Sequence, residues 1–222
     1  MKKALQSLPI LLVLGFVVLL AHCETGVQPS PKPGLLRITL QADPTDSLIV
    51  IARDTLKRSY RDSMQITVFQ GKAYNDSNFA VLRKDTLQRF AQDHKYNILK
   101  KNPEDSTYKT FKIFEYFVPP GQYDKIQFGI SAQFMQLTYG YVHGGLPVQM
   151  EKAPGANLLV DLQQEFTIES REITEINVIL SPFDSATRYL DLFRFTPKVR
   201  IVNVEYPGEF HSRYFNPYEF RE

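Results

Sequence analysis

The chain has 222 residues, of which 43% are hydrophobic and 23% charged, with 14 prolines and 11 glycines. This composition is globular and excludes a disordered or collagen-like chain. Lys2 and Lys3 lie in a segment that looks removable, so the mature chain keeps 24 basic against 24 acidic residues. Neutrality argues against nucleic acid as a partner, because that affinity rests largely on lysine and arginine neutralising phosphates. The single cysteine excludes an intramolecular disulfide and a zinc site made of thiolates alone.

The N-terminus has the pattern of a secretory signal. Two lysines precede 14 uncharged, mostly apolar residues at 8–21, a run shorter than the roughly 20 residues of a bilayer-spanning helix. Leu20-Ala21-His22-Cys23 follows and resembles the lipobox of bacterial lipoproteins, in which the cysteine after the cut receives thioether-linked diacylglycerol. The sequence departs from that motif at His22. We predict a lipoprotein signal peptide at residues 1–22 and lipidation of Cys23.

Two other outcomes are compatible with the same residues. Ala21-His22-Cys23 is a small-x-small site at which signal peptidase could cut after Cys23, or the segment could remain as an uncleaved anchor. Pro29, Pro31 and Pro33 fall within five residues and predict an extended spacer over 23–34, of the kind that holds a domain off a membrane.

From residue 35 onward, apolar residues recur mostly with a period of two, which is typical of strands. Ile126, Phe128, Ile130, Ala132 and Phe134 alternate, after which the pattern moves by one residue to Met135 and Leu137. Such a slip predicts a β-bulge in one long bent strand, or two strands. Shorter alternating runs occur at 36–40, 66–68, 113–117, 158–162, 166–168, 176–180 and 199–204.

Turn residues separate these runs, so the fold class predicted for residues 35–206 is all-β, an antiparallel β-sandwich. One or two short helices are expected in the N-terminal half. In residues 85–100, Leu87, Phe90 and Ala91 have helical spacing, and residues 54–61 form a weaker helix or loop candidate.

The order of features from Tyr116 to Val204 resembles a known family. It includes VPPGQYDKI at 118–126, a hairpin through His143-Gly144-Gly145, PGAN at 154–157, FTI at 166–168, INVIL at 176–180 and FTPKV at 195–199. These pieces are similar to the uncharacterised bacterial lipoprotein and exported family called domain of unknown function 4382. The resemblance implies a prealbumin-like or related β-sandwich on a cell envelope, and brings no enzymatic activity with it.

Residues with catalytic or metal-binding chemistry are scarce. His22, His94, His143 and His211 have no neighbour at zinc-ligand spacing, and His143 fits a hairpin turn. No Gly-x-Ser-x-Gly, phosphate-binding glycine loop or His-Glu-x-x-His occurs. We predict no catalytic residue, no metal site and no cofactor.

The acidic residues near turns favour a structural role. Asp43, Asp46, Asp76, Glu104 and Asp105 adjoin proline, asparagine or serine, where turn capping by side chains is the simplest interpretation. Residues 75–78 (NDSN) supply a fragment of a calcium loop, without its glycine and terminal glutamate.

Two aromatic segments are candidate binding elements. Residues 133–141 favour a buried core strand. The tail at 207–222, together with Tyr206, interleaves aromatic and charged residues beyond the last predicted strand. Such a tail packs back over a sheet edge or presents anchors to a partner.

These features predict an exported lipoprotein of the bacterial cell envelope, at the outer membrane, with a non-enzymatic binding or structural domain. Its expected partners are the membrane, through the lipid on Cys23, and an envelope protein or glycan. One alternative is an adhesin-like or assembly subunit that adds a strand of another chain to an exposed edge. An alternative of another class is an envelope hydrolase with carboxylates or His143 in a loop cleft.

Overall fold

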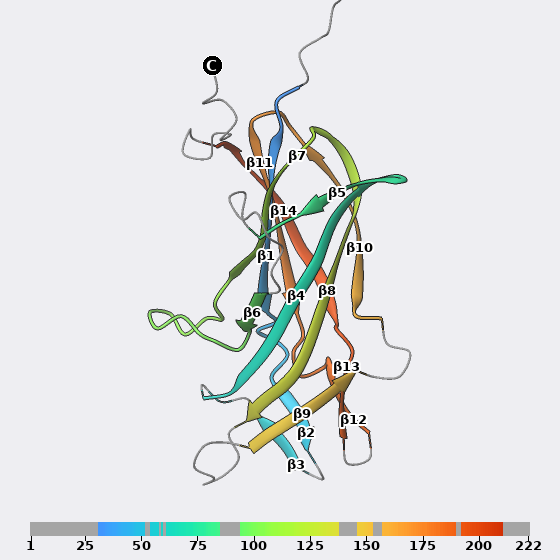
Figure 1. Cartoon of the computed structure of the whole chain (residues 1–222). Coiled ribbons are helices and arrows are strands. Elements are labelled where there is room, and N and C mark those ends of the chain that lie inside the picture. The colour runs from blue at the N-terminus through green and yellow to red at the C-terminus, as the bar shows by residue number, and fades with distance from the viewer. Residues whose placement is uncertain are drawn as a thin grey trace, which may run out of the picture. The chain divides into compact units, whose positions relative to one another are not determined.

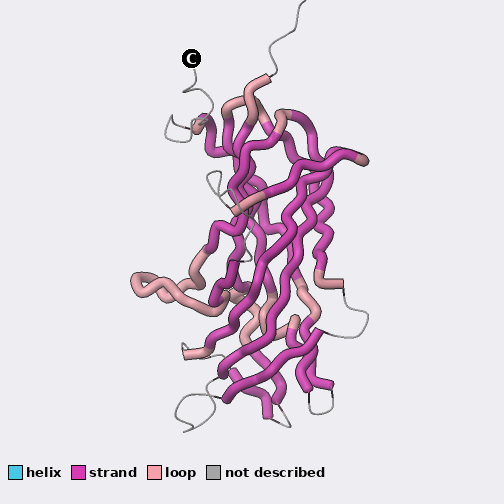
Figure 2. The backbone as a smooth tube through the Cα atoms, in the orientation of Figure 1, coloured by secondary structure: helices cyan, strands magenta, loops and turns pink. Residues whose placement is uncertain are grey.

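The fold is described from a computed structural model, which covers residues 31–51, 54–57, 59, 61–84, 94–137, 146–152, 157–189 and 192–210. The chain divides into two units, Met1–Ser30 and Pro31–Glu222, and every described residue lies in the second. Figure 2 shows strands and loops in this part and no helix. The all-β prediction is confirmed.

Two main sheets and a small hairpin contain all the described strands (Figure 1). The four-stranded sheet has the order β14-β11-β1-β7. The eight-stranded sheet has the path β12-β13-β9-β8-β4-β5, with β10 paired to β8 and β6 paired to β4, while β2 and β3 form a separate hairpin. The strands are β1 (Gly34–Ala42), β2 (Leu48–Ile51), β3 (Asp54–Lys57), β4 (Ser63–Asn75), β5 (Asn78–Leu82), β6 (His94–Asn97), β7 (Phe111–Val118), β8 (Gly121–Leu137), β9 (Leu146–Lys152), β10 (Leu159–Ile168), β11 (Glu172–Leu180), β12 (Ala186–Tyr189), β13 (Leu192–Phe195) and β14 (Val199–Glu209).

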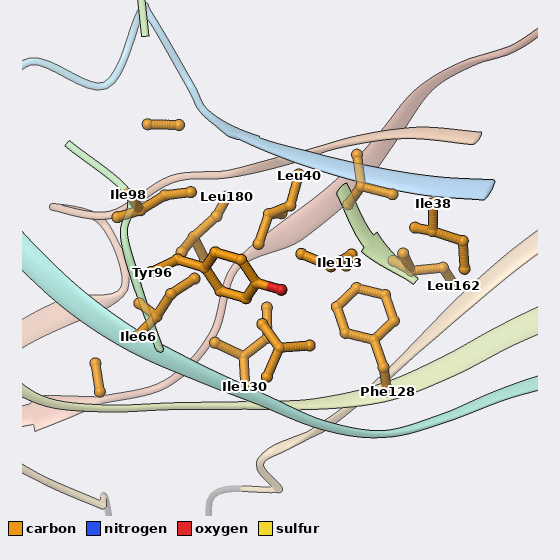
Figure 3. Packing of buried hydrophobic residues seen from close by; sticks show 14 of the residues in the cluster. Ile38, Leu40, Ile66, Tyr96, Ile98, Ile113, Phe128, Ile130, Leu162 and Leu180 are labelled. Atoms are coloured by element: carbon orange, nitrogen blue, oxygen red, sulfur yellow. The ribbon is translucent and has the colours of Figure 1, made fainter. Parts of the chain in front are cut away.

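The core lies between the two main sheets, because each contributes alternate apolar side chains to it. Ile38 and Leu40 of β1 face Phe128 and Ile130 of β8 (Figure 3), and all four are fully buried. Burying side chains of this size contributes about 2 kcal/mol each. This hydrophobic packing holds the two sheets together.

Strand β8 confirms the predicted bulge. Its pairing with β4 shifts between Gln65 and Ile66, where Gln133 is the extra residue between Ala132 and Phe134. The core face therefore passes from Ala132 to Met135 and Leu137, which are buried, while Phe134 is 40% exposed. One strand of 17 residues spans the sheet, rather than two.

Most ladders are antiparallel, as expected, but two pairs are parallel. Strand β1 pairs in parallel with β11 over its length, from Leu35 opposite Ile173 to Ala42 opposite Leu180, and β13 pairs in parallel with β9. A parallel pair joins strands far apart in sequence, so alternation along either strand does not reveal it.

The helix predictions are corrected where the structure describes them. Asp54–Lys57 is strand β3, paired with β2. Residues 85–93 lie outside the described residues, but His94–Asn97 is strand β6, paired with β4. Tyr96 and Ile98 are both buried, which is the spacing of a strand face.

The two sides of the sandwich are closed differently. On one side, the Glu115 amide of β7 donates to the Arg83 carbonyl, just after β5, at 2.9 Å. On the other side, β10 and β14 are edges of different sheets, and the Thr167 amide donates to the Tyr206 hydroxyl at 3.4 Å. A backbone bond thus joins the sheets at β5 and β7, whereas a side chain links them at β10 and β14.

Candidate functional site

Most residues singled out for chemistry fall outside the described residues. These are Cys23, His22, His143 and His211. The backbone of His94 lies at the start of β6. Within the described ranges, no group of three or more histidine, cysteine or acidic residues could hold a metal ion.

The acidic residues at 43 and 46 connect loops. Asp43 accepts hydrogen bonds from the amide and the hydroxyl of Thr45 at 2.9 and 2.6 Å. Asp46 accepts hydrogen bonds from the backbone amides of Phe183 and Asp184 at 2.7 and 3.2 Å. Burial is the main cause that raises the pKa of the Asp46 carboxyl, and the charges of Asp184 and Asp43 add to it, against the lowering effect of the two amides. Both carboxylates are occupied by protein donors.

The other predicted turn residues behave in the same way. Asp105 accepts from the amide and the hydroxyl of Thr107 at 2.9 and 2.8 Å. Asp76 lies in the turn between β4 and β5 with a φ of 50°, a left-handed conformation that aspartate tolerates. The calcium-loop fragment at 75–78 is therefore the end of a hairpin.

The described start of the tail packs back onto the fold. Strand β14 extends to Glu209, beyond the predicted boundary at 206. Phe210 then contacts Phe117 of β7, with ring centroids 5.5 Å apart, and its amide donates to the Arg171 carbonyl. Residues 211–222 lie outside the described residues.

The outer face of the eight-stranded sheet carries a group of aromatic rings and lysines on β4, β5 and β8. We call it the ring–lysine face and define it by Phe69, Lys72, Tyr74, Phe79, Lys125 and Gln127. These positions alternate with buried ones such as Ala73 and Ile126. In Figure 1, β4 and β8 pass in front of the four-stranded sheet.

Each ammonium on this face lies over a ring. The Lys72 nitrogen is 4.3 Å from the centroid of Phe79, and the Lys125 nitrogen is 4.0 Å from that of Tyr74. The two rings are themselves 5.6 Å apart and tilted by 46°. Phe79 is 51% exposed. Attraction between a cation and the negative face of a ring holds each lysine in place.

A hydrogen-bonded row continues from the rings across the sheet. The Tyr74 hydroxyl donates to Gln127 at 3.1 Å, and the Gln127 amide nitrogen donates to Asp161 of β10 at 2.7 Å. Asp161 is exposed. The face therefore combines apolar rings, amide and carboxylate groups and two cations on a regular sheet.

Gly129 gives the Phe69 ring its place on this face. A Cβ built on Gly129 would lie 2.2 to 2.5 Å from three carbons of that ring. Phe69 and Gly129 are paired across β4 and β8, so the ring covers the glycine backbone directly. A larger residue at 129 would displace it.

The outer face of the four-stranded sheet has a different kind of charge arrangement. Glu115 is 1% exposed and accepts from Arg37 Nε at 2.7 Å and Lys112 Nζ at 2.6 Å. Arg37 also donates to Glu175 at 2.9 Å. Burial alone would lower the pKa of the Arg37 guanidinium, but the hydrogen bonds and charges of Glu115 and Glu175 outweigh it and the pKa is raised. These charges satisfy one another.

Comparison with protein-family models, with curated proteins and with solved structures finds no match. In the part of the chain that the structure describes, no helix is long and apolar enough to cross a membrane.

The sequence analysis did not identify the ring–lysine face. Its signal was present as Lys72 and Tyr74, then Phe79 and Val81, at alternate positions on either side of an Asn-Asp-Ser turn. That pattern predicts a hairpin whose rings share one face. The contributions of Lys125 and Gln127 depend on long-range pairing, which no local pattern reveals.

Proposed function

We propose that this chain is an exported lipoprotein of the bacterial cell envelope, tethered to the outer membrane through lipid on Cys23. Its β-sandwich is a non-enzymatic binding or structural module. The observation that carries the proposal is the position of Cys23, the only cysteine, directly after a basic head and a 14-residue apolar run. The resemblance to the uncharacterised lipoprotein family is part of the same proposal.

The boundary between spacer and domain supports a tethered arrangement. Strand β1 begins at Gly34, immediately after Pro33, the last of the three closely spaced prolines. Residues 23–33 in an extended proline-rich conformation would span about 34 Å. Such a spacer places a folded module at a distance from the lipid.

The use of the loop carboxylates supports a binding role over hydrolysis. Asp43, Asp46 and Asp105 each accept hydrogen bonds from nearby amides. A general acid or base needs its carboxyl within reach of a substrate proton. These three groups instead fix turns and loop junctions.

Strand-edge assembly is a second candidate, and strand β5 favours it. Strand β14 is an edge with two register shifts, Pro207 and three charged residues, features that oppose pairing with another chain. Strand β5 pairs only with β4 among the described strands, without a shift, and contains no charged residue or proline. Its open edge ends at Arg83, whose carbonyl accepts the Glu115 amide of β7. Its Phe79 and Val81 are 51% and 53% exposed.

Mass spectrometry of the N-terminal peptide tests the main proposal. The protein is extracted with detergent from membranes of its native host, beside a Cys23→Ser variant. We expect a diacylglyceryl mass on Cys23, and loss of both the lipid and membrane association in the variant. An unmodified N-terminus at Glu24 or later, on soluble protein, would contradict the tether.

A further inference from the structure

Two cations on the ring–lysine face have no carboxylate partner among the described residues. Lys72 and Lys125 take part in no ion pair within the described residues, whereas Lys112 on the other sheet lies 2.6 Å from Glu115. Their ammonium groups are 4.3 and 4.0 Å from ring centroids, closer than the 5.0 to 5.9 Å of the other described lysine–ring pairs. The rings thus fix the position of two positive charges that no carboxylate of the described ranges neutralises.

The aromatic rings beside these cations offer a second kind of contact. Phe69 and Tyr74 lie on either side of Lys72 along β4, and Phe79 lies next to Tyr74 on β5. Phe69 covers Gly129, so no β8 side chain stands at that position. Rings on an open sheet present apolar area at low conformational cost.

Polar groups complete the chemistry of the face. Gln127 bridges Tyr74 and Asp161, and Asp161 is exposed at the far end of this row. A ligand matched to all three components has apolar C–H faces, many hydroxyl groups and scattered negative charge. A polysaccharide that contains acidic sugars has each of these.

We propose that the ring–lysine face binds an acidic polysaccharide. A pyranose ring stacks on Phe69, sugar hydroxyls bond to Gln127 and Asp161, and sugar carboxylates lie against Lys72 and Lys125, which Phe79 and Tyr74 hold in place. The balanced charge of the mature chain agrees with a ligand held by two cations and an aromatic ring rather than by a broad basic surface. The inference rests on the proposed function, because a location in the cell envelope brings the face into contact with such polymers.

Affinity electrophoresis of the full mature chain in detergent tests this inference. Native gels contain polygalacturonate, or neutral dextran at the same concentration. We expect polygalacturonate alone to retard the protein. Because two charges are engaged, the logarithm of the affinity should fall against that of salt concentration with a slope of about 2.

The decisive comparison is between two double variants that remove the same charge. Lys72→Ala with Lys125→Ala should weaken binding about tenfold. Lys101→Ala with Lys109→Ala, which removes two lysines from other lysine–ring pairs, should leave it within about twofold. Phe69→Leu keeps an apolar side chain over Gly129 and should weaken binding without unfolding the sheet.

Any of three results would overturn the inference: no retardation by polygalacturonate, equal retardation by dextran and polygalacturonate, or equal weakening in the two double variants. Binding by protein whose Cys23 carries no lipid would contradict the tether and keep the ligand assignment. Lipid on Cys23 in a protein that polygalacturonate does not retard would support the tether and contradict the ligand assignment.

Discussion

The outer faces of the two sheets use charge in opposite ways. On the four-stranded sheet, Glu115 is buried and each of its oxygens meets a cation, from Arg37 and Lys112. On the eight-stranded sheet, Lys72 and Lys125 meet only rings among the described residues. A buried charge without a partner is costly, whereas a partly exposed lysine over a ring is not. The first face depends on its charges for stability, and the second can offer them to a ligand.

Glu115→Gln should have the largest effect on stability. The substitution replaces the buried carboxylate and weakens its two charge-assisted hydrogen bonds, from Arg37 and Lys112, while Arg37 keeps its bond to Glu175. We expect the free energy of unfolding to fall by about 3 kcal/mol for the two bonds together, measured by urea denaturation monitored by circular dichroism.

Lys112→Met is the matched control for this effect. The Lys112 side chain is 43% exposed, and in its absence Arg37 still pairs with the buried Glu115 carboxylate, so Lys112→Met should cost less than Glu115→Gln. Equal stability of Glu115→Gln and the parent would show that the buried carboxylate does not stabilise the sheet.

Gly129→Ala should have an intermediate effect on stability, and it changes the ring–lysine face. The new methyl group would occupy the place of the Phe69 ring, whose carbons lie 2.2 to 2.5 Å from it. Displacing the ring should cost about 2 kcal/mol of unfolding free energy.

A double-mutant cycle with Phe69→Ala isolates this contact. Removing the ring makes room for the methyl group, so adding Gly129→Ala to Phe69→Ala should cost less than Gly129→Ala alone. Strict additivity of the two changes would mean that the ring does not lie over Gly129 in solution.

The sequence pattern predicted where strands occur better than it predicted which strands pair with each other. Alternation located seven of the 14 described strands, and the phase slip near Phe134 predicted the bulge in β8, because a buried side chain must follow the strand period. The parallel pairing of β1 with β11 was missed, since it joins Leu36 to Thr174 across the length of the chain. The sequence also failed to reveal β6, a strand of four residues whose partner β4 lies about 30 residues away along the chain.

The residues of the two outer faces differ in how far the sequence alone could group them, because one set is local and the other is brought together by long-range pairing. Lys72, Tyr74 and Phe79 lie in one hairpin and could be recognised together. Arg37, Glu115 and Glu175 come from three strands that are distant in sequence, and only the register of β1 with both neighbours brings them together. Local sequence contains the information for the first set and not for the second.

Asp43→Asn should have the smallest effect and depend on pH. Burial alone would raise the pKa of Asp43, but hydrogen bonds from Thr45 and the charge of Arg200, 3.4 Å away, outweigh it and the pKa is lowered. A carboxyl with a lowered pKa stabilises the fold above its unfolded pKa, and this contribution is lost as pH falls through the folded value. We expect a cost of about 1 kcal/mol at pH 7, which shrinks as pH falls below the ordinary pKa of aspartate and is lost once the pH passes the lowered pKa of the folded state.

Asp105→Asn provides the matched control, because Asp105 and Thr107 form the same local turn as Asp43 and Thr45. Asp105 is exposed and has no arginine among its described partners, so its substitution should affect stability less than that of Asp43. Urea denaturation of both variants at pH 7 and pH 3 compares the two turns. If both cost the same at pH 7, then the local turn alone accounts for the effect, and the cross-strand contact with Arg200 contributes nothing to the four-stranded sheet.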